Sequence, residues 1–231
     1  MKTLLIGERY RNLLENPLKL QGFRPIWLPD NPKIDKRLAG HTDLNAFYGR
    51  GELYLAEHLY CIPEIVKEIT NGARKIRKSE VCGMHPNDAV LCAAELGGKL
   101  LHKASVTEPR LLALYATEFI SVKQAYARCA VCCVRSDAII TADGGIAKAA
   151  ERLGTDVLHI APGGFCLEGF REGFIGGSSF TDFADSKVYF TGTLAQCTDA
   201  DRILAFMQKH GTQPVFLTDR PAFDIGSAIL L

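Results

Sequence analysis

Short apolar runs, most of them preceded by a turn, recur along the chain and predict a series of β-hairpins. Gly, Asp or Ser residues stand before four of these runs, and these residue types suit tight hairpin turns. The runs that we expect to form strands are residues 52–55, 99–102, 138–141, 187–190 and 2–6. Since the last of these runs stands at the N-terminus, we expect it to pair with the C-terminal run 225–231.

A helix and a further strand are predicted after each hairpin. Ile62, Ile65, Val66 and Ile69 share one helical face by their i, i+3, i+4, i+7 spacing. Further helices are expected near residues 10–14, 107–115, 143–153 and 198–210, where Thr107, Asp143 and Thr198 are the expected helix starts. Third strands are expected at residues 24–28, 119–123, 156–160 and 214–217, with a poorly marked one near 78–82.

This strand–strand–helix–strand repeat recurs about every forty-five residues, and each repeat opens with a polar residue. The openings are His41 with Asp43, Asn87 with Asp88, Cys129, Glu172 and Asp224. They are 46, 42, 43 and 52 residues apart, and counting from Asp224 through the termini to His41 gives 48. We therefore predict one α/β domain over residues 1–231, a propeller of five ββαβ repeats whose openings share one axis. A doubly wound α/β sandwich with coincidental spacing is the alternative.

Composition narrows the class of protein and of partner. The chain is 47% hydrophobic and 23% charged, which suits a sizeable core. A net charge of +1 without a long single-sign run argues against nucleic-acid and membrane partners. No apolar run suits a signal peptide or a membrane span, so we expect a cytoplasmic protein. Its eight cysteines are then expected to be reduced thiols, most of them in the core.

The order of these openings resembles that of the pentein-fold guanidino-modifying enzymes, which include arginine deiminase, agmatine deiminase and dimethylarginine dimethylaminohydrolase. His41-Thr42-Asp43 resembles their His-x-Asp strand, and 87–92 with 97–102 resembles the next hairpin. Cys129 within 127–131 resembles their nucleophile strand. The chain looks still more like an uncharacterised bacterial branch of that fold, through residues 40–43, 122–132, 167–170, 173–178 and 224–226.

The resemblance implies a cysteine-dependent hydrolase or transferase that acts on an arginine-like guanidino or amidino compound. A guanidinium carbon is weakly electrophilic, so its attack needs a thiolate, and carboxylates bind the planar cation. Cys129 would attack, His41 would act as acid and base, and Asp43 would bind substrate or orient His41. The candidate substrate-binding residues are Asn87, Asp88, Arg128, Glu168, Glu172 and Asp224. Arg128 could also stabilise the thiolate, and no metal or cofactor is expected.

The position of the cysteine implies a difference from the enzymes. Their nucleophile lies in the last repeat, whereas Cys129 lies in the third repeat of this chain. The cyclic order of the openings is the same if the ring is cut at another point. We therefore expect a circular permutation, with the ring closed by the C-terminal strand against the N-terminal repeat.

Other interpretations of the same residues stay open. His41 and Asp43 would share a face of a strand, which favours a joint function. Each residue also has a structural interpretation: His41 as a structural histidine, Cys129 as a core residue and Asp224 as a turn-forming residue. The chain could instead bind a small cationic or amino-acid ligand without turnover. Cys129 and Cys132 could also serve a thiol or metal function, although an extended strand would turn them to opposite faces. The oligomeric state is left open.

Overall fold

The computed structural model describes residues 1–70 and 75–231, and these residues form an α/β fold with five small three-stranded sheets. The strands, sheet by sheet, are β3 (Ala46–Gly49), β4 (Glu52–Ala56) and β5 (Lys75–Ser79); β6 (Ala94–Leu96), β7 (Lys99–His102) and β8 (Phe119–Ser121); β9 (Val131–Arg135), β10 (Ala138–Thr141) and β11 (Asp156–His159); β12 (Ser179–Asp182), β13 (Lys187–Phe190) and β14 (Gln213–Phe216); β15 (Ile229–Leu230), β1 (Lys2–Gly7) and β2 (Phe23–Leu28).

All five sheets share one hydrogen-bonding plan. The middle strand pairs antiparallel with one neighbour and parallel with the other, as β4 does with β3 and β5. The predicted middle strands β4, β7, β10, β13 and β1 are confirmed. The strand expected near residues 78–82 lies instead at Lys75–Ser79, because its polar sequence KIRKS gave no apolar pattern to fix its position.

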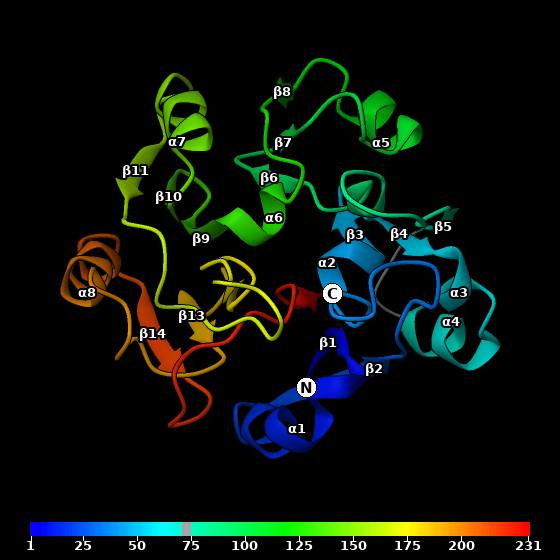
Figure 1. The fold of residues 1–231 in the computed structure, drawn as a ribbon, viewed down its shortest axis with the longest axis horizontal. Helices are drawn as coiled ribbons and strands as arrows, with labels where there is room; N and C mark the ends of the chain where they lie inside the picture. Colours follow the sequence, from blue (N-terminus) through cyan, green and yellow to red (C-terminus); the bar gives the residue numbers. More distant parts are fainter. Residues whose placement is uncertain (71–74) are drawn as a thin grey trace.

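Longer helices cover the outside of the sheets (Figure 1). They are α1 (Arg11–Leu20), α4 (Pro63–Ile69), α5 (Pro109–Leu114), α7 (Gly144–Glu151) and α8 (Ala200–Lys209). Asp143 caps α7 as expected, since its side chain accepts hydrogen bonds from two backbone amides of the first turn. At α5 the cap is Glu108 rather than Thr107, because the Glu108 carboxylate accepts the amide hydrogen of Arg110. The residue before α8 is Asp199 rather than Thr198.

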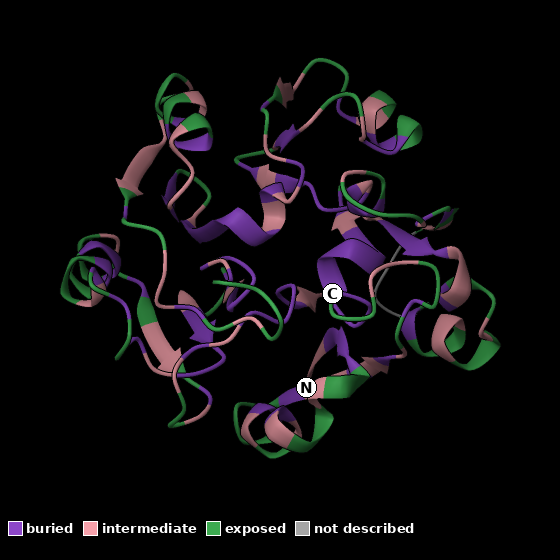
Figure 2. Ribbon diagram, in the orientation of Figure 1, coloured by how far each residue is buried: buried purple, intermediate pink, exposed green. Residues whose placement is uncertain are grey.

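The sheets lie around a common centre (Figure 1), and the C-terminal strand β15 lies beside β1. β15 pairs antiparallel with β1 through Leu4 with Leu230 and Leu5 with Ile229, which confirms the expected pairing over a shorter span. The first strands of neighbouring sheets are also in contact, namely β9 with β12, β12 with β15, and β15 with β3. Figure 2 shows many buried residues around this centre, while the outer helices and the loops carry most of the exposed ones.

Short helical turns, and not strands, carry the opening residues of three repeats. They are α2 (Thr42–Asn45), the 3-10 turn η2 (Asn87–Ala89) and α6 (Ala127–Ala130). The prediction that His41 and Asp43 lie on a strand is therefore wrong, since His41 is the N-cap of α2 and Asp43 lies inside this helix. The remaining short elements are α3 (Glu57–Tyr60) and the 3-10 turn η1 (Glu8–Tyr10). Among the described residues, the helices are too short or too polar to span a membrane.

Candidate functional site

Cys129, Asp43 and His41 converge at the centre of the fold. The Cys129 thiol donates a hydrogen bond to Oδ2 of Asp43 at 2.7 Å. One ligand atom from each of the three residues lies within 4.8 Å of the others. Nδ1 of His41 stands 3.9 Å from Oδ1 of Asp224. All four side chains are buried, so the polar groups of two distant repeats and the C-terminal segment share one enclosed site.

Backbone contacts with the C-terminal segment hold α2 in this site. The amides of Thr42 and Asp43 donate to the carbonyls of Ile225 and Gly226, at 3.4 and 2.9 Å. Gly226 has a φ of +68°, and a Cβ atom there would lie 2.5 Å from Cβ of His41. Glycine is therefore required at this position both for its conformation and for the close approach of α2.

The fourth repeat contributes the backbone of Gly176 and Gly177 to the site rather than a charged side chain. The amide of Gly177 donates to the carbonyl of Cys129 at 2.9 Å, and its carbonyl accepts from the amides of Ile225 and Ser227. A Cβ atom on Gly176 would lie 2.3 Å from the carbonyl oxygen of Val131. This glycine pair thus brings α6 and the C-terminal segment together around the Cys129 thiol.

Asp224 is both a turn-forming residue and a neighbour of His41. Its Oδ2 accepts the amide hydrogen of Phe174 at 2.8 Å, and its Oδ1 accepts that of Gly226 at 2.9 Å. These two bonds fix the carboxylate beside the imidazole of His41. This geometry suits a residue that orients the imidazole of His41.

Cys92 is a site residue that the sequence analysis did not identify. Its thiol donates to the same Oδ2 of Asp43 at 3.3 Å. Cys92 stands two residues before β6, just as Cys129 stands two residues before β9. Aligning the second and third repeats on these strands, instead of on Asn87, would have found it. Cys132 packs in a different apolar cluster from Cys129, so the CxxC spacing does not form a dithiol.

Burial controls the protonation of the central groups. Desolvation raises the pKa of Asp43 to about 6, against the opposing effects of His41 and the hydrogen bond from Cys129. Burial raises the pKa of Cys92 to about 11. It also raises the pKa of the Cys129 thiol, and Cys92, Asp43 and Asp224 act in the same direction. The resting site therefore holds protonated thiols against a carboxylate.

Two polar atoms of the site face inward without a partner. Among the described residues, Nε2 of His41 and Oδ1 of Asp43 are buried and accept or donate no hydrogen bond. Such atoms are costly in a protein interior and are typical of binding sites. Imidazole, carboxylate and thiolate are also zinc ligands, so His41, Asp43 and Cys129 are the residues that could hold a metal ion.

The remaining candidates lie farther out. Asp88 is buried, its Oδ2 accepts a hydrogen bond from Tyr126 at 2.9 Å, and burial raises its pKa. Tyr126 packs against the apolar cluster that contains Cys129, so Tyr126 connects Asp88 to that cluster. Asn87 and Glu168 are exposed, and they take no part in the central hydrogen bonds.

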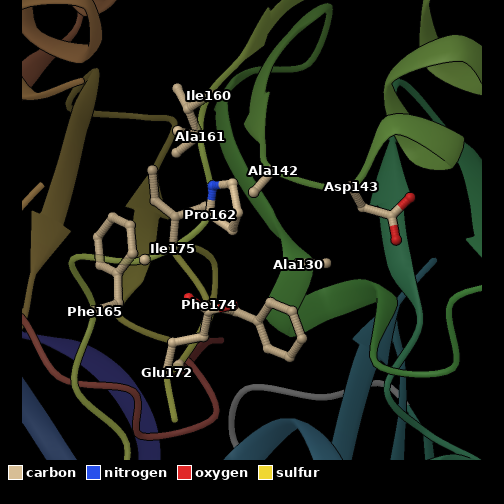
Figure 3. Close-up of a pocket in the computed structure, with 12 residues that line it drawn as sticks. Ala130, Ala142, Asp143, Ile160, Ala161, Pro162, Phe165, Glu172, Phe174 and Ile175 are labelled. Atoms are coloured by element: carbon tan, nitrogen blue, oxygen red, sulfur yellow. The ribbon is translucent and has the colours of Figure 1, made fainter. Parts of the chain in front are cut away.

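Arg128 and Glu172 line two separate pockets. Arg128 lines, together with Asp43, a pocket of about 520 Å³, and its Nη1 donates to the carbonyl of Val131. Glu172 is exposed and lines a pocket of about 130 Å³ beside Phe174 (Figure 3). Phe174 also packs against the apolar cluster that contains Cys129. The structure does not bring Glu172 to Cys129.

Changing Asp43 to Asn is expected to alter how stability depends on pH. The folded protein binds a proton on Asp43 more tightly than the unfolded chain, whose carboxyl has its ordinary pKa of 3.8. The contribution of Asp43 to the free energy of unfolding therefore falls as pH rises from about 4 to about 6. Relative to wild type, Asp43→Asn should gain up to about 3 kcal/mol across this window. Urea denaturation at several pH values measures it.

The exposed Asp219 provides the control for this experiment. Asp219→Asn should leave the pH dependence of the wild-type protein unchanged. Parallel stability curves for Asp43→Asn and wild type between pH 4 and 6 would contradict the assigned protonation of Asp43.

The fold is shared with solved structures of dimethylarginine dimethylaminohydrolase, a pentein-fold enzyme. One is its adduct with 4-chloro-2-hydroxymethylpyridine, at 10% identity and a TM-score of 0.56, covering 100% of this chain and 99% of that chain. A cysteine-to-serine variant from Pseudomonas aeruginosa with citrulline has 9% identity and a TM-score of 0.55, over 97% and 92%. A histidine-to-glycine variant, as an adduct with S-methyl-L-thiocitrulline, has 9% identity and a TM-score of 0.53 over the same shares.

These similarities establish the pentein fold, and they do so at an identity too low to carry an activity. No protein of curated function matches the sequence. One family model does match, over residues 5–229, and it describes a family of unknown function, DUF6873. That match spans nearly all of the chain, which is therefore a member of the DUF6873 family with a pentein fold.

Proposed function

We propose that this chain is a cysteine-dependent hydrolase of a small guanidino or amidino compound related to arginine. The observation that carries the proposal is the buried convergence of the Cys129 thiol, the Asp43 carboxylate and the His41 imidazole. A thiol beside a base and an anionic binding group is the arrangement that attack on a guanidinium carbon requires. The complexes of the similar enzymes with citrulline and S-methyl-L-thiocitrulline support an amino-acid-like ligand.

Substrate binding begins at Asp43 in this proposal. Its Oδ1 is buried and unpartnered among the described residues, so a guanidinium N–H group can donate to it. Asp88 also has a buried Oδ1 without a partner in the described part of the chain, and it is the second carboxylate candidate. The bound cation would lower the pKa of Cys129, because it offsets the negative charges of Asp43 and Asp224 that now raise it. Substrate thus activates its own nucleophile.

The chemistry then follows in two balanced steps. The Cys129 proton passes to His41, and the sulfur attacks the guanidinium carbon. The carbon–nitrogen bond to the leaving amine breaks as His41 returns the proton to that nitrogen. In the second step His41 takes a proton from water, the hydroxide attacks the carbon, and the carbon–sulfur bond breaks. Cys129 recovers the proton from His41, the hydroxyl proton of the product passes to the released amine, and the product carries a urea group in place of the guanidinium.

The architecture around this site is also part of the proposal. We propose a single domain over residues 1–231, built as a five-bladed propeller and circularly permuted relative to the guanidino-modifying enzymes. The pairing of β15 with β1 supports a ring that is cut between them. A cytoplasmic location is part of the proposal as well, because a free catalytic thiol needs a reducing compartment.

A binding protein without turnover is the second candidate. The burial of Cys129 and its raised pKa favour it, because a protonated and enclosed thiol is a poor nucleophile. Asp43 would bind the same guanidinium group in either case, so affinity for such ligands does not separate the two functions. Product formation does.

The proposal predicts turnover of at least one of arginine, agmatine and the Nω-methylarginines. Each compound is incubated with the protein, and mass spectrometry measures the ureido product while an enzymatic assay measures released ammonia or amine. Thermal shifts are recorded in parallel. Turnover supports the hydrolase, and a thermal shift without product supports the binding protein. Neither a shift nor product from any of these cations would reject the assignment of this site to guanidino compounds.

A further inference from the structure

Two thiols share one carboxylate oxygen at the centre of the fold. The sulfur of Cys129 lies 2.7 Å from Oδ2 of Asp43, and that of Cys92 lies 3.3 Å from the same atom. The two sulfurs are therefore no farther apart than the sum of these distances. Both residues belong to one buried apolar cluster with Leu44 and Ala89. Neither thiol needs to cross the core to reach the other.

The backbone also holds these two cysteines in register. The amide of Arg128 donates to the carbonyl of Cys92 at 2.9 Å, which fixes the start of α6 against the chain just before β6. A disulfide requires Cα atoms about 4.4–6.8 Å apart, and this backbone bond holds the two segments that carry the cysteines side by side. The pair is thus preorganised by bonds that do not involve the thiols themselves.

We propose that Cys92 and Cys129 form a reversible disulfide when the protein reacts with a hydroperoxide. Cys129 is the attacking thiol and Cys92 the resolving thiol. The inference concerns the two thiols and Asp43 alone, so its test does not depend on turnover of a guanidino substrate.

The reaction balances with Asp43 as the local base. Asp43 accepts the Cys129 proton as the sulfur attacks the distal oxygen of hydrogen peroxide, the oxygen–oxygen bond breaks, and the proton leaves with hydroxide as water. Cys129 is then a sulfenic acid. The Cys92 sulfur attacks the Cys129 sulfur, the sulfur–oxygen bond breaks, and a second water departs with the Cys92 proton. Two thiols are oxidised and one peroxide is reduced to two waters.

Oxidation would change the site in two ways. Cys129 would no longer have a free thiol, so any chemistry at that sulfur would stop until a reductant restores it. Asp43 would lose both hydrogen-bond donors to Oδ2, while its Oδ1 already has no partner among the described residues. A buried carboxylate without donors is unfavourable, which keeps the disulfide easy to reduce.

The other cysteines are not arranged for this reaction. Cys132 and Cys133 are buried in two different apolar clusters, and neither thiol donates to a carboxylate. Cys61 and Cys166 are exposed. The thiol of Cys82 donates to the carboxylate of Glu80 at 3.8 Å, but no second thiol among the described residues donates to that carboxylate. Selectivity for one pair among eight thiols is therefore the distinguishing expectation.

The test is peptide mapping of the full-length protein after treatment with one equivalent of hydrogen peroxide and alkylation of the remaining thiols. Trypsin leaves Cys92 with Cys82 and leaves Cys129 with Cys132 and Cys133 in single peptides. A second cleavage before Asp88 separates Cys82, and a Cys132→Ser/Cys133→Ser variant leaves Cys129 alone in its peptide. We expect a cross-linked Cys92–Cys129 peptide that dithiothreitol abolishes, with the other thiols alkylated.

Cys92→Ser is the key variant, and Cys197→Ser is its control at a buried cysteine away from the site. With two equivalents of hydrogen peroxide, Cys129 of Cys92→Ser should pass through sulfenic to sulfinic acid, whereas Cys197→Ser should form the disulfide as wild type does. Sulfinic acid on Cys129 in wild type at the same rate as in Cys92→Ser would overturn the inference. So would a cross-link between Cys129 and any other cysteine. If a variant does not fold, fragmentation of the cross-linked wild-type peptide in the mass spectrometer distinguishes Cys129 from Cys132 and Cys133 and decides the case.

Discussion

Replacing Cys129 with serine is expected to reduce hydrolysis of a guanidino substrate by at least about 10³-fold, because a hydroxyl is a far weaker nucleophile than a thiolate towards this carbon. The substitution changes one atom in a buried position, so the fold and substrate affinity should survive. The decisive measurement is the rate of ureido-product formation, with binding followed separately by calorimetry. Loss of the rate with retention of affinity is the expected pair of results.

Cys132→Ser is the matched control for this substitution. Cys132 is equally buried and three residues away, but it packs in another apolar cluster. Its replacement should affect stability and leave the rate near that of wild type. Equal losses of rate in the two variants, or a Cys129→Ser protein that turns over normally, would remove Cys129 from the proposed mechanism.

Replacing Gly177 with alanine is expected to destabilise the protein by about 3 kcal/mol or more, because the new methyl group has no space. Its Cβ would lie 2.0 Å from Oδ1 of Asp224. Neither side can move freely, since Gly177 is bonded to Cys129, Ile225 and Ser227 through its backbone. Chemical denaturation monitored by circular dichroism measures the change in the free energy of unfolding.

Gly144 offers a matched control for the same substitution. A Cβ there would lie 3.8 Å from His159, which is ordinary contact, and Gly144 opens the helix α7. Gly144→Ala should change the free energy of unfolding by no more than about 1 kcal/mol, in the stabilising direction. Comparable destabilisation by both substitutions would mean that the contact between Gly177 and Asp224 is not the cause.

The sheets were predictable because their strands carry two independent signals. In β4 and β7, an apolar run follows a turn that contains glycine, and each signal places the hairpin within a residue or two. β5 lacked both, since its sequence is mostly basic. The short turns α2 and α6 were not predictable, because four residues are too few to show a helical period.

The candidate site was only partly predictable for a related reason. Spacing placed His41, Asp43, Cys129 and Asp224 at equivalent positions around one axis, and the structure brings these four side chains together. Cys92 was not predicted as a site residue, because Asn87 and Asp88, a few positions earlier, are the polar residues that mark the opening of its repeat. The exposure of Glu168 and Glu172 depends on the path of a long loop, which no local pattern determines.

The backbone hydrogen bonds between α2 and residues 225–226 have a consequence for folding during synthesis. A ribosome synthesises His41 and Asp43 early, yet the carbonyls that hold them, at Ile225 and Gly226, follow about 180 residues later. Contacts of such high sequence separation form slowly, since closing so long a loop costs conformational entropy. We expect the nascent chain to keep its central thiol unpaired with Asp43 for most of its synthesis. The reactive centre would then be assembled as one of the last events of folding.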